Sequence, residues 1–193
     1  MSARLKQVLG AIDSANARDT GRDEATDTPA ALLYGQRMSA RLAAFAHDPS
    51  DALQIAVRGQ HIERWTIFRN DFPAGRVGYL RWRNELKEFH AKRLGDLMTE
   101  AGYDRDTIAR VSSIVRKEDF RSDADGQTCE DVACLVFLEF YAPDFAAKHD
   151  EAKVIDIVRK TWRKMSAAGH EAARRTTLTP AVAAIVTKAL AVG

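Results

Sequence analysis

The chain has 193 residues, of which 46% are hydrophobic and 29% are charged, and this composition is ordinary for a soluble globular protein. Its formal net charge of +2 argues against a large nucleic-acid footprint and does not by itself indicate a membrane. A chain of this length can bury a proper core, so we expect a single domain over residues 1–193.

The two cysteines and the N-terminus indicate the compartment. Cys129 and Cys134 are five residues apart on one expected helix, which is a poor geometry for a disulfide. The first ten residues lack the apolar run of a signal peptide, and no segment approaches membrane-spanning length. We therefore expect a cytoplasmic protein with no membrane partner, and the oligomeric state stays open.

The periodic segments are nearly all helical, with apolar residues three and four positions apart. In chain order, helices are expected around Leu5–Ile12 and over about 29–45, 50–64, 79–101, 104–116, 128–142, 150–168 and 179–190. Asn16–Pro29, 66–78 and 118–127 are expected to be loops. No alternating strand of useful length occurs, so the fold class is all-α, a globular bundle of about seven or eight helices.

One of these helices carries an acid where an apolar residue is expected. Asp131 shares a helical face with Cys134, Leu135 and Leu138. A buried carboxylate must be paired, bind a metal or take up a proton, because its desolvation is costly. The alternative is a half-buried acid near the helix N-terminus, where the helix dipole favours a negative charge.

Two histidines on other expected helices could be the partners of Asp131. Together with Glu130, His61 and His90 make a set of imidazole and carboxylate ligands that suits a divalent cation such as Fe, Mn, Ni or Zn. Each ligand comes from a different helix, so the set has no local signature. Each histidine could equally be a hydrogen-bonded structural residue.

Several phrases of the sequence resemble a known family. L-L-Y-G-Q-R-M, G-Q-H-I-E-R-W, E-D-V-A-C-L-V-F-L-E-F-Y and K-T-W-R-K-M are similar to the family of domain of unknown function 4202. The resemblance covers about residues 4–190 and implies no activity, because that family has none assigned.

A more distant resemblance is to the HD-domain metal-dependent phosphohydrolases, which are all-helical. A-L-Q-I-A-V-R-G-Q-H-I, F-H-A-K-R-L-G-D-L-M and E-D-V-A-C-L-V-F-L resemble three of their ligand-bearing helices. This resemblance implies an HD-like core over about 30–142, followed by C-terminal helices over 150–190. It carries over only His61, His90 and Asp131 as metal ligands, with Glu130 as a further candidate. The His-Asp pair and the first histidine of that family have no counterpart here.

Basic and aromatic residues are interleaved on the same expected helices. Arg64, Arg81 and Arg83 lie near the candidate ligands in sequence, and arginine binds phosphate in a bidentate manner. A phosphorylated small molecule or a nucleotide would therefore fit the same site. The alternative is a solvated face whose charges are offset by nearby acids.

Two main hypotheses follow. In the first, the protein is a divalent-metal-dependent phosphohydrolase acting on a nucleotide or another phosphate ester. His61, His90 and Asp131 would hold the metal, Glu130 would ligate it or orient water, and the three arginines would hold phosphate. In the second, it is a non-catalytic nucleotide-, RNA- or protein-binding module on a degenerate HD-like fold. A third hypothesis, an iron oxidase, is disfavoured. It would use Glu130, Glu139 and His149, and these residues lack the ligand spacing of ferritin-like sites.

Overall fold

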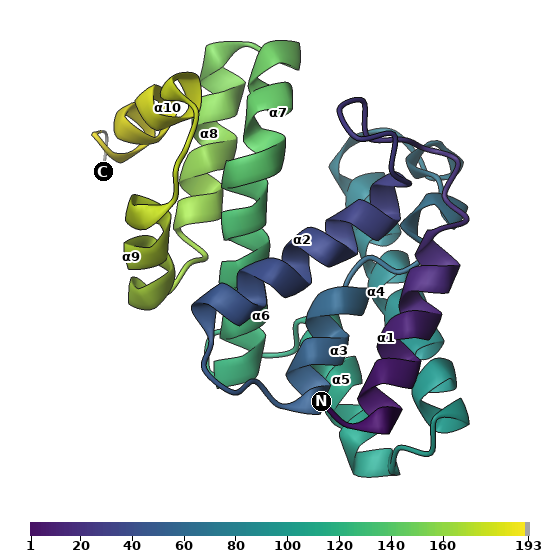
Figure 1. The fold of residues 1–193 in the computed structure, drawn as a ribbon. Coiled ribbons are helices and arrows are strands. Elements are labelled where there is room, and N and C mark those ends of the chain that lie inside the picture. The colour runs from purple at the N-terminus through teal and green to yellow at the C-terminus, as the bar shows by residue number, and fades with distance from the viewer. Residues whose placement is uncertain (192–193) are drawn as a thin grey trace. The chain divides into compact units, whose positions relative to one another are not determined.

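The computed structural model describes residues 1–191, and within them the chain is all-α, as expected (Figure 1). The described helices group into two compact units, residues 1–120 and residues 121–193. The expected single domain stays a prediction, because two compact units can belong to one domain or to two. None of the described helices is both long enough and apolar enough to cross a membrane.

Unit 1 is built around its third helix. Its helices are α1 (Ala3–Asn16), α2 (Ala30–Phe45), α3 (Asp51–Gly59), α4 (Gly75–Glu100) and α5 (Arg105–Arg116). Helix α3 contacts each of the other four, which explains why Ile55 and Val57 on it are fully buried. Two short 3-10 turns, Arg64–Thr66 and Arg69–Asp71, connect α3 to α4.

Unit 2 contains the remaining described helices. They are α6 (Ala124–Val136), α7 (Ala142–Lys148), α8 (Glu151–Trp162), α9 (Ala167–Arg175) and α10 (Pro180–Leu190). A π-helical turn, Phe137–Tyr141, joins α6 to α7. Helix α8 packs against α7 and α10, and α6 packs against α9 (Figure 1).

Four helices begin next to capping side chains, within one residue of their expected starts. Ser50, Asp104, Asp150 and Thr179 each accept a hydrogen bond from a backbone N–H in the first turn of the helix that follows. Gly102, just beyond α4, has a φ of +77° and takes the left-handed conformation typical of a glycine after a helix. Local chemistry therefore predicted these boundaries correctly.

Several boundaries differ from expectation. Helix α6, for example, begins at Ala124 instead of about residue 128. Helix α3 ends at Gly59 instead of about residue 64, so His61 and Arg64 lie in the segment after it. Glu63 then adopts a left-handed conformation with φ of 50°, which is incompatible with continuing the helix. Helix α4 begins at Gly75, four residues earlier than expected. Helix α9 was not expected as a separate helix.

Candidate functional site

The first element of the site in unit 1 is a stacked pair of rings. The rings of Tyr34, on α2, and His61, just after α3, have centroids 4.5 Å apart with an angle of 17° between their planes. The hydroxyl of Tyr34 donates a hydrogen bond of 2.9 Å to Oε1 of Gln60. The early end of α3 thus places His61 against a ring whose position is fixed by a neighbouring residue.

A second histidine lies beside the first. His90 on α4 is buried, and the centroid of its ring is 6.0 Å from that of His61. Neither ring nitrogen of His90 makes a hydrogen bond with the described residues, which is uncommon for buried polar atoms. The structure therefore brings together two imidazoles that the sequence placed 29 positions apart.

Both imidazoles are held in the neutral form. Burial, together with the nearby charges of Arg64 and Arg83, lowers the pKa of His90 to about 4. The backbone of Ile62 raises the pKa of His90, although it lies outside hydrogen-bonding geometry with the ring. The pKa of His61 is well below its usual value, first through burial and then through Arg64 and the ring of His90. A neutral imidazole offers one donor and one acceptor, or one metal-binding nitrogen.

Two arginines lie next to these rings. The Arg64 guanidinium lies over the indole of Trp82, 4.6 Å from its centroid, and the Trp82 indole is held by a 3.0 Å hydrogen bond to the carbonyl of Ile67. The pKa of Arg64 is lowered by burial and then by the charge of Arg83. Within residues 1–191, neither arginine forms an ion pair with a carboxylate.

We call Tyr34, His61, Arg64, Arg83 and His90 the histidine–arginine cluster. Its charge is positive, and the Lys117 ammonium adds to the positive potential at His61. Arg58 of unit 1, by contrast, binds Asp13 through two hydrogen bonds of 2.7 and 2.6 Å. The cluster contains two guanidinium groups close enough that the charge of Arg83 lowers the pKa of Arg64, and neither has a carboxylate partner within residues 1–191.

The structure does not bring Arg81 into this cluster. Arg81 is exposed on α4, and it is two residues from Arg83, which places the two side chains about 200° apart around the helix axis. No described contact joins Arg81 to the residues of the cluster.

Asp131, in unit 2, is buried, which decides between the two alternatives, and its partners are visible. Its Oδ1 accepts hydrogen bonds from the backbone N–H of Ser166 at 2.8 Å and from Nε2 of Gln127 at 3.1 Å. Its Oδ2 accepts a 2.5 Å hydrogen bond from the Ser166 hydroxyl. Ser166 caps α9, accepting a hydrogen bond from the N–H of Gly169, so Asp131 sits at a helix N-terminus that favours its negative charge. Protein donors thus account for a buried carboxylate there.

Glu130 has a different neighbour. One of its carboxylate oxygens lies 3.3 Å from the ammonium nitrogen of Lys164, while the rest of its side chain is almost fully buried. The predicted metal ligands are therefore divided, with His61 and His90 in unit 1 and Glu130 and Asp131 in unit 2. Within the described residues of either unit, no three His, Cys, Asp or Glu side chains form a group that could hold a metal. Convergence of the four residues on one cation stays a prediction.

The fold and this cluster define an all-α protein with two neutral histidines beside two unpaired arginines. The chain belongs to the family described as Domain of unknown function (DUF4202), whose profile matches residues 6–186. Comparisons with curated proteins and with solved structures find no match.

Sequence reasoning identified His61, His90, Arg64 and Arg83 and missed two supporting residues. Tyr34 was not among the expected site residues, and its stacking on His61 has no signal in the sequence. Trp82 was not among them either, and its position next to Arg83 gave no signal, because adjacent residues of a helix point about 100° apart.

Proposed function

We propose that the histidine–arginine cluster of unit 1 binds the phosphate group of a nucleotide or of another phosphorylated small molecule. The observation that supports this proposal is the pair of neighbouring guanidinium groups, Arg64 and Arg83, which lack a carboxylate partner within residues 1–191. Their mutual repulsion is relieved when an anion binds between them, and guanidinium matches phosphate geometry. The neutral rings of His61 and His90 can each donate one further hydrogen bond.

An exposed aromatic ring beside the arginines favours a nucleotide over simpler phosphates. Tyr79 is 45% exposed, and its ring centroid lies 5.9 Å from that of Trp82. It is also close enough to Arg64 to influence that residue's pKa. A flat base could stack on such a ring while its phosphate reaches the guanidinium groups.

The test is a calorimetric titration of the full-length protein with inorganic phosphate, AMP, ADP and adenosine. We expect the phosphorylated compounds to bind and adenosine to bind weakly. Arg64→Gln and Arg83→Gln should each weaken phosphate binding by roughly tenfold or more, because each removes charge-assisted hydrogen bonds. Arg76→Gln, at an exposed arginine of the same helix, is the matched control and should bind normally. Equal affinity in all four proteins would refute the proposal.

A second candidate is the divalent-metal-dependent phosphohydrolase, and the state of His90 favours it. Neither ring nitrogen of His90 has a hydrogen-bond partner within residues 1–191, and its neighbour His61 is neutral, which is the form in which imidazole binds a metal. These two residues fit Fe, Mn, Ni or Zn. The distant HD-domain resemblance adds Asp131 as a third ligand and Glu130 as a ligand or water-orienting group. A bound cation would acidify a water molecule for attack on phosphorus, while Arg64 and Arg83 hold the phosphate.

Elemental analysis separates this candidate from a non-catalytic module. Protein without an affinity tag is compared with His61→Ala and Asp131→Ala after circular dichroism has confirmed that each is folded. Near-stoichiometric metal that is lost in both variants supports a hydrolase and justifies a screen of phosphate esters. Wild-type protein without metal, even after incubation with each cation, contradicts it. The non-catalytic nucleotide-, RNA- or protein-binding module is then the better account of the cluster.

We further propose a cytoplasmic location. Cys129 and Cys134 are both buried as thiols and are not joined in a disulfide, as suits a reducing compartment.

A further inference from the structure

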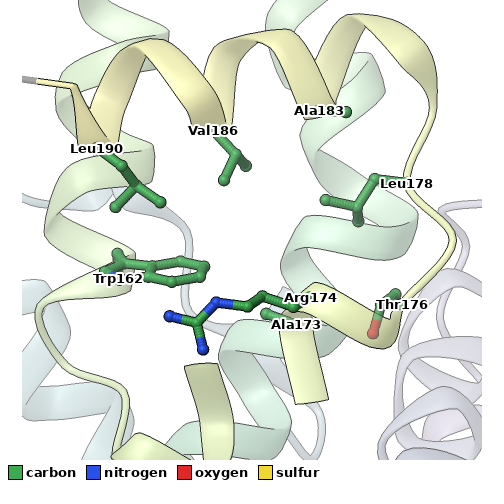
Figure 2. Close-up of a pocket in the computed structure, with 8 residues that line it drawn as sticks. All are labelled: Trp162, Ala173, Arg174, Thr176, Leu178, Ala183, Val186 and Leu190. Atoms are coloured by element: carbon green, nitrogen blue, oxygen red, sulfur yellow. The ribbon is translucent and has the colours of Figure 1, made fainter. Parts of the chain in front are cut away.

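Unit 2 contains a pocket that the proposed function does not use. Its volume is about 350 Å³, and it is lined by residues from the ends of α8 and α9 and from α10 (Figure 2). The lining residues are Trp162, Ala173, Arg174, Thr176, Leu178, Ala183, Val186 and Leu190. This volume lies at the lower end of the range for small-molecule sites, about 300–1,000 Å³.

The walls of the pocket are apolar and incompletely covered. Figure 2 shows Leu190, Val186 and Ala183 of α10 across the pocket from the indole of Trp162 and from α9. Leu190 is 43% exposed, and the side chains of Val186 and Leu178 are only half-buried. A ligand with an apolar body would cover this surface and gain the corresponding hydrophobic free energy.

The aromatic wall is held in place before any ligand arrives. The ring of His170 stacks on the Trp162 indole at 4.3 Å with an interplanar angle of 7°. The Nε2 atom of His170 also lies 2.8 Å from the carbonyl oxygen of Trp162. Since the indole is already fixed, binding against it costs little side-chain entropy.

Arg174 supplies a cation at this apolar wall. Its guanidinium carbon lies 5.9 Å from the centroid of the Trp162 ring, and Figure 2 shows the guanidinium beside the indole. Glu171 contacts Arg174 at 3.3 Å but Arg175 at 2.8 Å. Arg175 is also the main cause of the lowered pKa of Glu171. Arg174 is therefore the weaker partner of Glu171 and can turn to an anion in the pocket.

We propose that this pocket binds a small monocarboxylate with an apolar aryl or alkyl body. The carboxylate accepts hydrogen bonds from Arg174, and the body lies between Trp162 and the side chains of α10. A neutral apolar molecule would cover the same walls but would leave the guanidinium unused. The monocarboxylate is favoured over a phosphate because a single arginine faces an otherwise apolar lining.

The experiment is a calorimetric titration of the full-length protein with phenylacetate and hexanoate, beside the uncharged phenylacetamide and hexanamide. We expect each acid to bind at least about tenfold more tightly than its amide. The two acids distinguish an aryl from an alkyl body. Arg174→Gln should remove the difference between acid and amide, whereas Glu171→Gln should tighten acid binding because it releases Arg174. Arg163→Gln, at an exposed arginine outside the lining, should change nothing.

A second set of variants shows whether binding occurs in this pocket. Val186→Trp fills the cavity and should abolish binding of acids and amides alike. Ala183→Phe, at an exposed lining position, serves the same purpose if Val186→Trp fails to fold. The proposal is overturned if neither acid binds at millimolar concentration. It is overturned equally if acid binding survives the cavity-filling variant or is unaffected by Arg174→Gln.

Discussion

His90 is the residue whose protonation is most clearly coupled to folding. Its pKa is about 4 in the folded protein and about 6.5 in an unfolded chain. Between these values the unfolded state binds a proton that the folded state does not, so the free energy of unfolding falls as the pH is lowered. Above about pH 6.5, His90 does not lower the free energy of unfolding. Between about pH 6.5 and 4, the free energy of unfolding falls by about 1.4 kcal/mol for each pH unit of acidification.

Urea unfolding at pH 7.5, 6.0 and 5.0 tests this prediction. His90→Leu removes the titrating group and keeps an apolar side chain in its place, so its stability should fall less steeply with acidification. His47→Leu, at an exposed histidine outside the cluster, is the control and should follow the wild type. Curves of identical slope for His90→Leu and the wild type would contradict the prediction.

The Asp131 carboxylate makes a second prediction at this scale. Its two oxygens accept two hydrogen bonds from Ser166 and one from Gln127. Asp131→Ala should lower the free energy of unfolding by about 1–3 kcal/mol, because buried donors lose their acceptor. Ser166→Ala should have a smaller effect, and the double variant should cost less than the sum of the two. Additive losses in urea unfolding would show that the two side chains act independently.

This arrangement also shows what the sequence could reveal about the site. Helical periodicity placed Asp131 on an apolar face and left open whether it is buried or half-buried, and the cost of desolvation required a partner for a buried carboxylate. It could not identify Ser166, which is 35 positions later and caps a helix that the sequence analysis did not predict. The proximity of His61 and His90 likewise depends on where α3 ends, and no local pattern specifies that point.

At the scale of the helices, two glycines in helix interiors should respond oppositely to alanine. A Cβ at Gly78 of α4 would overlap the backbone carbonyl of Pro73, whereas one at Gly10 of α1 would meet nothing within 4 Å. Gly78→Ala should therefore destabilise the protein by about 1–3 kcal/mol through overpacking. Gly10→Ala should stabilise it by about 0.5–1 kcal/mol, because alanine loses less backbone entropy in a helix. Urea unfolding of the two variants measures both changes in the free energy of unfolding. Changes of the same sign would contradict this prediction.

Helix starts with a capping side chain were easier to predict than the end of α3. Capping side chains such as Ser50 and Asp104 act on their own first turn, so their effect can be inferred from a few residues. The end of α3 depends on Gly59, where a Cβ would collide with Leu94 of another helix. The helix that carries Asp131 was expected to end at about residue 142. Instead Pro143 lies in the first turn of α7, which continues from the π-helical turn, a position where proline is tolerated.

For the molecule as a whole, the balance of charge makes specific anion binding measurable. The chain has 29 basic and 27 acidic residues, so its general attraction for anions is weak and chloride is a suitable reference at matched ionic strength. If the histidine–arginine cluster binds phosphate, folded protein is stabilised by mass action, by about 2.7 kcal/mol at a concentration 100 times the Kd. The midpoint temperature of thermal unfolding should then rise with the logarithm of the phosphate concentration.

The rise in unfolding temperature should be seen for unit 1, which contains Trp65 and Trp82. It should disappear in Arg64→Gln. Arg76→Gln should keep it, because that arginine is exposed and outside the cluster. A shift that chloride reproduces, or that survives Arg64→Gln, would mean that phosphate acts as a general salt. A shift seen only with phosphate and dependent on Arg64 would mean that the repulsion between the two guanidinium groups is relieved by a bound anion. Unit 1 would then carry unpaired charge in order to bind its ligand.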